Sequence, residues 1–177
     1  MKIIEKVKKN ITSWFYFPRN DLRLILFCLS AIIILDLTSK YFIFNMKFDG
    51  YYIISFLNIL KVKNYGISFG LFSEYRAIAI YFIITFDFII MLYLLHCFQM
   101  KNIYKYQRFF VIAVCLIFGG AAGNVFDRVC YGYVRDFIDF HLGKHHWPCF
   151  NIADICICVG TAMFAICEIF FKKNHNK

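Results

Sequence analysis

Charged residues are scarce in this sequence. They make up 18% of the 177 residues, whereas 61% of the residues are hydrophobic, with 23 Phe, 12 Tyr and only two Pro. An ordinary soluble domain carries about 25% charged residues and about 45–50% apolar ones. The shortage of charge argues against a soluble domain and favours a membrane protein. Since each crossing needs roughly 20 residues, the length allows one domain of about four spanning helices.

Acidic residues are scarcer still, with 11 Asp and Glu against 20 Lys and Arg and a net charge of +9. A basic chain can bind nucleic acid, but these bases lie in short clusters between apolar runs and form no interleaved basic face. Anionic phospholipid headgroups explain that placement better. We therefore expect a membrane partner and no nucleic acid, and we find no internal repeat or second domain.

Four apolar stretches predict membrane spans at about 22–44, 76–98, 107–130 and 151–171. No small-x-small cleavage site follows the first stretch, so we interpret it as an uncleaved span. Basic residues without acids lie between the second and third spans and at the end of the chain. By the positive-inside rule both termini face the cytoplasm, and the loops at about 45–75 and 131–150 face outward. The alternation in Leu60–Lys63 predicts a short strand that enters a turn at Asn64.

Ionisable groups inside a span cost about 2.5–3.5 kcal/mol each, so each needs a partner, water or a function. Asp36 and Lys40 stand four residues apart on one helix face, which makes a structural ion pair the default interpretation. Active-site scaffolding and substrate contact are the alternatives. Asp87 has no evident partner on its own helix and is expected to face the bundle interior.

The third span ends in a glycine-rich stretch followed by polar residues. Gly119 and Gly123 form a small-xxx-small ridge that lets another backbone approach closely. Asn124 and Arg128 share a helix face beyond the ridge, with Asp127 beside them. Plain packing and solvation of the helix end are the simpler interpretations, and Arg128 is open to pairing with Asp127 or to holding a substrate carbonyl.

Two further carboxylates lie at the expected outer face. Asn151 is placed as a helix N-cap, which puts Asp154 in the first turn of the fourth span, where the helix dipole favours an anion. If Asp136 lies opposite, the two carboxyls can share one proton, so that one activates water while the other protonates a carbonyl oxygen. A plain capping role for Asp154 is the alternative. Asp127 and Asp139 are also open as catalytic candidates.

Metal and nucleophile motifs are lacking. His141, His145 and His146 lie in a predicted loop with no acidic or cysteine partner at regular ligand spacing, so we expect no metal site and no cofactor. Most cysteines lie in apolar runs, and only Cys130 and Cys149 flank a polar loop where a bridge is conceivable. No Ser, Thr or Cys lies in a recognisable nucleophile motif.

Five blocks together resemble the ordered motifs of bacterial lipoprotein signal peptidase, across about 120 residues. They are Asp36-Leu-Thr-Ser-Lys40, Asn64-Tyr-Gly-Ile-Ser-Phe69, Gly119-Gly-Ala-Ala-Gly-Asn-Val-Phe-Asp-Arg128, Gly132-Tyr-Val-Arg-Asp-Phe137 and Phe150-Asn-Ile-Ala-Asp154. Ile67 and Ser68 replace the small residues usual in the second block, and Asp87 and the histidines have no counterpart in the pattern.

The resemblance implies an aspartyl endopeptidase with Asp136 and Asp154 as its catalytic pair. It implies substrate-binding or supporting roles for Asn64, Gly120, Asn124, Arg128, Asn151, Asp36 and Lys40. It implies four transmembrane helices with a small extracytoplasmic β-cradle and a short periplasmic helix. The implied substrate is a diacylglyceryl-modified prolipoprotein cut before its lipidated cysteine at the outer face of the inner membrane, and we expect a monomer. The alternative class is a small membrane transporter or binding subunit that uses intramembrane Asp and Lys.

Overall fold

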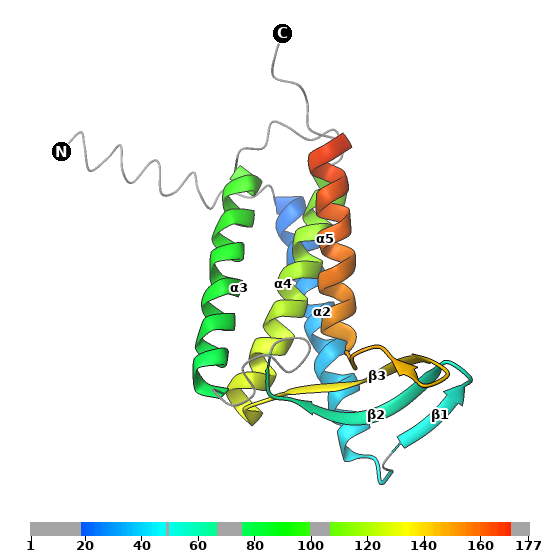
Figure 1. Ribbon diagram of the computed structural model, residues 1–177. Coiled ribbons are helices and arrows are strands. Elements are labelled where there is room, and N and C mark those ends of the chain that lie inside the picture. Colours follow the sequence, from blue (N-terminus) through cyan, green and yellow to red (C-terminus); the bar gives the residue numbers. More distant parts are fainter. Residues whose placement is uncertain (1–18, 49, 67–75, 100–106, 171–177) are drawn as a thin grey trace, which may run out of the picture.

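A computed structural model describes residues 19–48, 50–66, 76–99 and 107–170. The elements are α2 (Arg19–Asn45), β1 (Gly50–Ile54), β2 (Leu57–Asn64), α3 (Arg76–Gln99), α4 (Gln107–Tyr131), β3 (Val134–Leu142), β4 (His145–His146) and α5 (Ile152–Phe170). The helices run side by side, and the sheet lies at one end of them (Figure 1). The start of α2 and the end of α5 both lie toward the opposite end of the bundle.

Helix α4 is the centre of the bundle and packs against both α2 and α5. Glycines allow the close approach: a Cβ on Gly119 would lie 2.8 Å from the Ile32 side chain of α2, and one on Gly120 would lie 2.5 Å from the Ala153 carbonyl oxygen of α5. Such distances are too short for a side chain. The predicted glycine ridge is therefore confirmed, with Gly123 against Asp36 as its second contact with α2.

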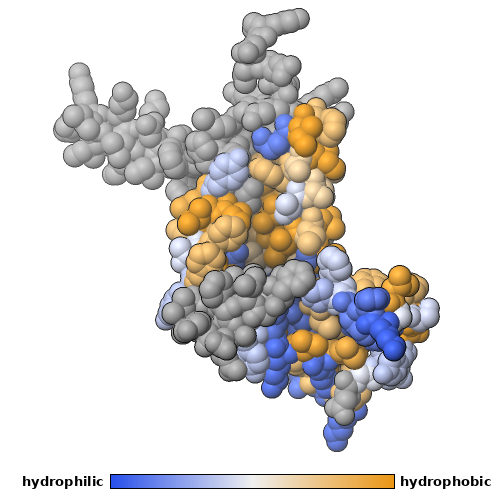
Figure 2. Space-filling view, in the orientation of Figure 1, coloured by the Kyte–Doolittle hydropathy of each residue, from blue (hydrophilic) through white to orange (hydrophobic). Residues whose placement is uncertain are grey.

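The outer surfaces of the helices are apolar. Large hydrophobic side chains are exposed along them, among them Phe27, Ile34, Ile89 and Ile169. Figure 2 shows hydrophobic side chains, in orange, over the helices and hydrophilic side chains, in blue, gathered toward the sheet. An exposed apolar surface of this extent needs a lipid environment. Three described segments are long and apolar enough to cross a membrane, namely Leu22–Asn45, Arg108–Tyr131 and Ile152–Phe170, while the described apolar part of α3 is Tyr81–Ile90.

The extramembrane part is an antiparallel sheet in the order β1-β2-β3-β4. The strand predicted at Leu60–Lys63 is confirmed as part of β2, and the Asn64 Oδ1 accepts the Gly66 N–H in the turn that follows (3.1 Å). Gly132, at φ 74°, ends α4 and turns the chain into β3. The described parts of the two outer loops, residues 46–48, 50–66 and 132–151, contain no helix, so the predicted periplasmic helix is not found there. The Ile67-Ser68 departure lies outside the described residues.

One irregularity in β2 decides which way its side chains point. Asn58 pairs with Asp139 and Ile59 with Ile138, but Val62 pairs with Asp136, so β2 carries one extra residue between Ile59 and Val62. Such a bulge reverses the alternation of side chains between the two faces of a strand. Asn58 and the later asparagine of β2, Asn64, therefore project to opposite faces of the sheet.

Candidate active site

Asp154 is fixed at the N-terminus of α5 by a reciprocal pair of hydrogen bonds. The Asn151 Oδ1 accepts the Asp154 N–H (3.0 Å), and the Asp154 Oδ2 accepts the Asn151 N–H (3.1 Å). This is the geometry of a capping box, and it confirms the predicted N-cap. The helix dipole stabilises negative charge at this position. One Asp154 oxygen is thereby held by its own helix, and the other faces the rest of the site.

Asp136 reaches the same place from β3 and is 1% exposed. Its Oδ1 accepts the Asn151 Nδ2–H (2.7 Å), and its Oδ2 accepts the Asn64 Nδ2–H (3.0 Å). Burial, and secondly the charge of Asp154, raises the pKa of Asp136 to about 7, while the two asparagine amides act in the opposite direction. Asp136 can therefore exchange a proton near neutral pH.

Asn124 of α4 joins the two carboxyl groups. Its Nδ2 donates to the Asp154 Oδ1 (2.8 Å), and its Oδ1 accepts from the Asn151 Nδ2 (3.1 Å). The same Asn151 Nδ2 also donates to Asp136. The Lys40 Nζ donates to the same Asn124 Oδ1 (3.0 Å). With its oxygen held by two donors, the amide of Asn124 is fixed with its N–H toward Asp154.

Asp36 and Lys40 form an ion pair of 2.7 Å, and both side chains are fully buried. The other oxygen of Asp36 accepts the Ala153 N–H at the start of α5 (2.9 Å). The predicted ion pair is confirmed, and it is also a scaffold. Through Asp36 it holds the first turn of α5, and through Lys40 it orients Asn124.

Asp127 is occupied elsewhere. It accepts hydrogen bonds from the Arg135 Nη2 (2.7 Å) and backbone N–H (2.9 Å) and lies 3.4 Å from the Lys40 Nζ. Its ion-pair partners are thus Arg135 and Lys40, and the considered pair with Arg128 does not form among the described residues. Successive side chains of a helix diverge, which explains why neighbours in sequence do not meet.

Arg128 lines the same cavity as the two carboxyl groups of Asp136 and Asp154. Its guanidinium interacts electrostatically with Asp87 of α3 and with Asp154 and Asp136. Asp87 is half-buried, in agreement with the expectation that it faces the bundle interior. A cation is thus held near both carboxyl groups.

A cavity of about 1150 Å³ lies between α3, α4, α5 and the sheet. Its polar lining includes Asp136, Asp154 and Arg128, and its apolar lining includes Phe82, Phe86, Phe140, Trp147, Ile155 and Val159. Among the described residues Asp127 and Asp139 do not border this cavity. Of the four carboxylates that the sequence left open, Asp136 and Asp154 are therefore the two with access to a bound molecule.

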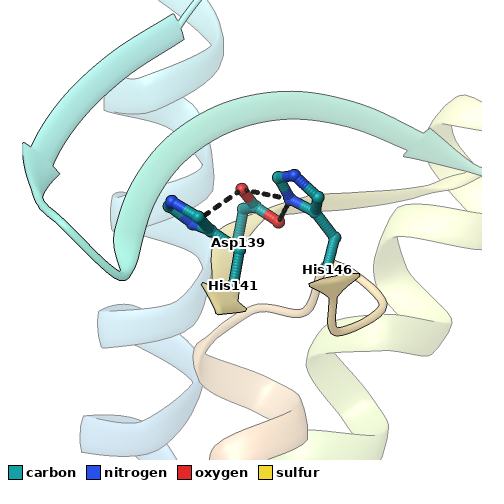
Figure 3. Close-up of side chains that lie close together, drawn as sticks. All are labelled: Asp139, His141 and His146. Atoms are coloured by element: carbon teal, nitrogen blue, oxygen red, sulfur yellow. Dashed lines mark hydrogen bonds and ion pairs between the residues drawn. The ribbon is translucent and has the colours of Figure 1, made fainter. Parts of the chain in front are cut away.

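The histidine cluster is not in an unstructured loop, and the expectation that it lacks an acidic partner is wrong. The β3–β4 hairpin brings His146 within 2.9 Å of the Asp139 carboxylate and His141 within 3.7 Å (Figure 3). The signal was present in the sequence, because residues 139 and 141 share one face of a strand. Cys130 and Cys149 are both free thiols, so the considered bridge is not formed.

Comparison with known proteins identifies the family. Residues 28–170 match the model of the family described as signal peptidase (SPase) II. Lipoprotein signal peptidase of Vibrio parahaemolyticus is 36% identical, covering 83% of this chain and 88% of the relative. The Buchnera aphidicola protein of the same name is 37% identical, covering 88% and 96%.

Solved structures agree with the sequence relatives. Two structures described as bacterial membrane enzymes, solved by the in meso method, are each 32% identical to this chain, with TM-scores of 0.68 and 0.67. They cover 82% and 83% of this chain and 87% and 93% of their own chains. Both the family match and these relatives cover most of the chain. The chain therefore belongs to the signal peptidase II family, a family of membrane peptidases.

Proposed function

We propose that this protein is an aspartyl endopeptidase that removes the signal peptide from diacylglyceryl-modified prolipoproteins, with Asp136 and Asp154 as its catalytic pair. The single observation that carries the proposal is the convergence of these two carboxyl groups, from β3 and α5, on one cavity through shared asparagine partners. Family membership supplies the reaction class.

The two carboxyls differ in a way that suits general acid–base hydrolysis. Asp136 is buried with a pKa of about 7, so it carries a proton in a large fraction of molecules at neutral pH. Asp154 lies at the positive end of a helix that stabilises its charge. Asp154 would take a proton from water as the water oxygen attacks the scissile carbonyl carbon, and Asp136 would give its proton to the carbonyl oxygen.

The second half of the reaction reverses these roles. When the tetrahedral intermediate collapses, the C–N bond breaks and the amine nitrogen takes the proton that Asp154 received. A hydroxyl proton of the intermediate returns to Asp136, which restores the starting state. Arg128, whose charge reaches both carboxyls, is positioned to hold a substrate carbonyl or the developing oxyanion.

The cavity fits a substrate that is both lipidic and peptidic. Its walls are largely aromatic and aliphatic side chains from α3, α5 and the sheet, and its polar groups gather around the two carboxyls. Acyl chains of a lipid-modified cysteine would pack against the helices while the adjoining peptide bond reaches the polar end. The pattern of basic residues supports four spans with both termini in the cytoplasm and this site at the outer face of the inner membrane.

The transporter alternative has less support. Asp36 and Lys40, which would have to serve an ion pathway, are fully buried and hold one another, Asn124 and the start of α5. Groups fixed in this way maintain the site and do not offer a free path for a solute.

The test is cleavage of a diacylglyceryl-modified lipobox peptide by the purified full chain in detergent micelles, followed by mass spectrometry. Asp136→Asn and Asp154→Asn should each lower the rate by about 10²- to 10⁴-fold, since each removes a proton-transfer group. The matched comparison is Asp87→Asn, a substitution of the same type in α3 that should slow cleavage far less, because Asp87 reaches the site only through Arg128. Cleavage by both dyad variants would refute the proposal, and a larger loss in Asp87→Asn would favour the transporter class.

A further inference from the structure

We propose that Asp139, His141 and His146 form a binding site for a divalent transition metal ion of the Zn²⁺ class, on the face of the sheet opposite the cavity. The site would be structural, and it is separate from the hydrolytic chemistry of Asp136 and Asp154.

The sheet register brings these side chains together. Asp139 and His141 are two residues apart on β3, and His146 pairs with His141 across the β3–β4 hairpin. All three therefore project from one face. Val134, Asp136 and Phe140, which line the cavity, have the opposite parity on β3 and face the other way. The hairpin turn depends on Gly143, at φ 60°.

The spacing of the donor atoms fits a metal ion. One ligand atom from each residue lies within 4.8 Å of the others. The Asp139 carboxylate lies 2.9 Å from the His146 Nδ1 and 3.7 Å from the His141 Nδ1, between the two rings (Figure 3). Ligand atoms of tetrahedral zinc at about 2.1 Å stand about 3.4 Å apart. Shifts of a few tenths of an ångström in the two Nδ1 atoms would bring both distances to the carboxylate to that value.

Asn58 supplies a second, independent observation. This side chain is 3% exposed, its Nδ2 contacts both the Asp139 Oδ2 (2.9 Å) and the His141 Nδ1 (3.3 Å), and its Oδ1 is buried with no partner among the described residues. A buried amide oxygen without a partner is unfavourable. A half-turn of the amide would exchange its two ends, so that the Oδ1 takes the place from which the Nδ2 now contacts Asp139 and His141 and becomes a fourth donor beside the carboxylate and the two imidazoles.

The donor set selects the kind of metal. Two imidazole nitrogens with carboxylate and amide oxygens suit Zn²⁺, Ni²⁺ or Cu²⁺ better than Mg²⁺ or Ca²⁺, which prefer all-oxygen sites. His141 is largely buried, whereas 52% of the His146 side chain is exposed, so an ion can enter from solvent. An imidazole binds the metal through a deprotonated Nδ1 and carries its proton on Nε2. A proton on Nδ1 must therefore move to Nε2 or leave to solvent on binding.

A metal here would fix the segment that connects the two halves of the dyad. Asp139 lies three residues after Asp136 on β3, and the chain runs from His146 through Phe150, which pairs with Ile138, into Asn151. The ion would tie β2, β3 and β4 together at that point. Its removal should therefore loosen the hairpin without removing either catalytic carboxyl.

The experiment uses the full chain purified through an affinity tag without histidine, stripped with a chelator and titrated with Zn²⁺ or Co²⁺. We expect about one equivalent bound, visible Co²⁺ absorption typical of four-coordinate nitrogen and oxygen ligation, and a higher Tm of the zinc-loaded protein. His141→Ala and His146→Ala should each weaken binding at least tenfold. Retained helical circular dichroism and precursor cleavage would show that these variants fold.

Matched controls separate this site from other ligands. His145→Ala removes the neighbouring exposed histidine, Cys149→Ser removes the nearest free thiol of the loop, and both should bind normally. Asp136→Asn should bind metal but not cleave, so failure of the proposed peptidase and failure of this site remain distinguishable. Absence of stoichiometric binding, or binding unchanged in both His141→Ala and His146→Ala, would overturn the proposal. So would loss of hydrolysis on chelation with unchanged Tm, because the metal would then serve the chemistry.

Discussion

Replacement of Lys40 by methionine should be among the most damaging single changes outside the dyad. Lys40 is fully buried and contacts Asp36 at 2.7 Å, Asn124 at 3.0 Å and Asp127 at 3.4 Å. Methionine keeps much of the volume but removes the charge, which leaves the Asp36 carboxylate buried without its cation. Breaking a buried pair in this way costs about 3–5 kcal/mol.

A double-mutant cycle isolates the interaction. In the Asp36→Asn/Lys40→Met variant both charges are gone, and the asparagine oxygen can still accept the Ala153 N–H. The remaining loss is a few hydrogen bonds at about 1 kcal/mol each. The double variant should therefore be more stable than Lys40→Met alone, with a coupling free energy of about 2–3 kcal/mol.

The assay is unfolding of the purified protein in mixed micelles, with Lys47→Met as the control for loss of an exposed lysine. Cleavage should also fall in Lys40→Met, because Lys40 fixes the Asn124 amide that donates to Asp154. The reasoning is refuted if Lys40→Met is as stable as the parent chain, or if the effects of the two single substitutions simply add.

Three further outcomes are expected. Gly120→Ala should destabilise the protein by about 1–3 kcal/mol and slow cleavage, because its Cβ would meet the Ala153 carbonyl at 2.5 Å and displace the start of α5. Asp136→Asn should gain stability relative to the parent chain as the pH rises from 4 to 8, as measured by pH-dependent unfolding. The pKa of Asp136 in the folded protein is raised from 3.8 to about 7, so the parent chain loses up to about 4 kcal/mol of unfolding free energy over that window. The variant has no carboxyl group there and loses none of it. Asn64→Ala removes a donor that stabilises ionised Asp136, so the alkaline limb of the cleavage rate should move to higher pH.

Much of this fold could be predicted because its elements depend on local signals. Long apolar runs and basic clusters located the helices to within a few residues: the first stretch was expected at about 22–44, and α2 covers Arg19–Asn45. The Asn151 cap and the glycine ridge also follow from nearest neighbours along a helix. That the helices cross a membrane in the predicted orientation stays a prediction.

The site was harder, because its contacts join distant parts of the chain. Spacing alone left Asp127, Asp136, Asp139 and Asp154 open, and only tertiary structure shows Asp127 held by Arg135 and Lys40 while Asp139 faces the histidines. The sheet in the 131–150 loop depends on pairing between β2 and β3, some 80 residues apart, and on a bulge that no local pattern revealed. The motif resemblance supplied the choice of the pair that local residues could not.

The central claim is that Asp136 and Asp154 share one proton during hydrolysis. The most direct measurement is the pH dependence of kcat/KM for cleavage of a diacylglyceryl-modified precursor by the purified chain. Because Asp136 must be protonated to act as the acid and its pKa lies at about 7, kcat/KM should decline above that pH. A rate that instead increases steadily from pH 7 to pH 9 would contradict the account, since it would require a nucleophile or base that becomes active only on losing its proton.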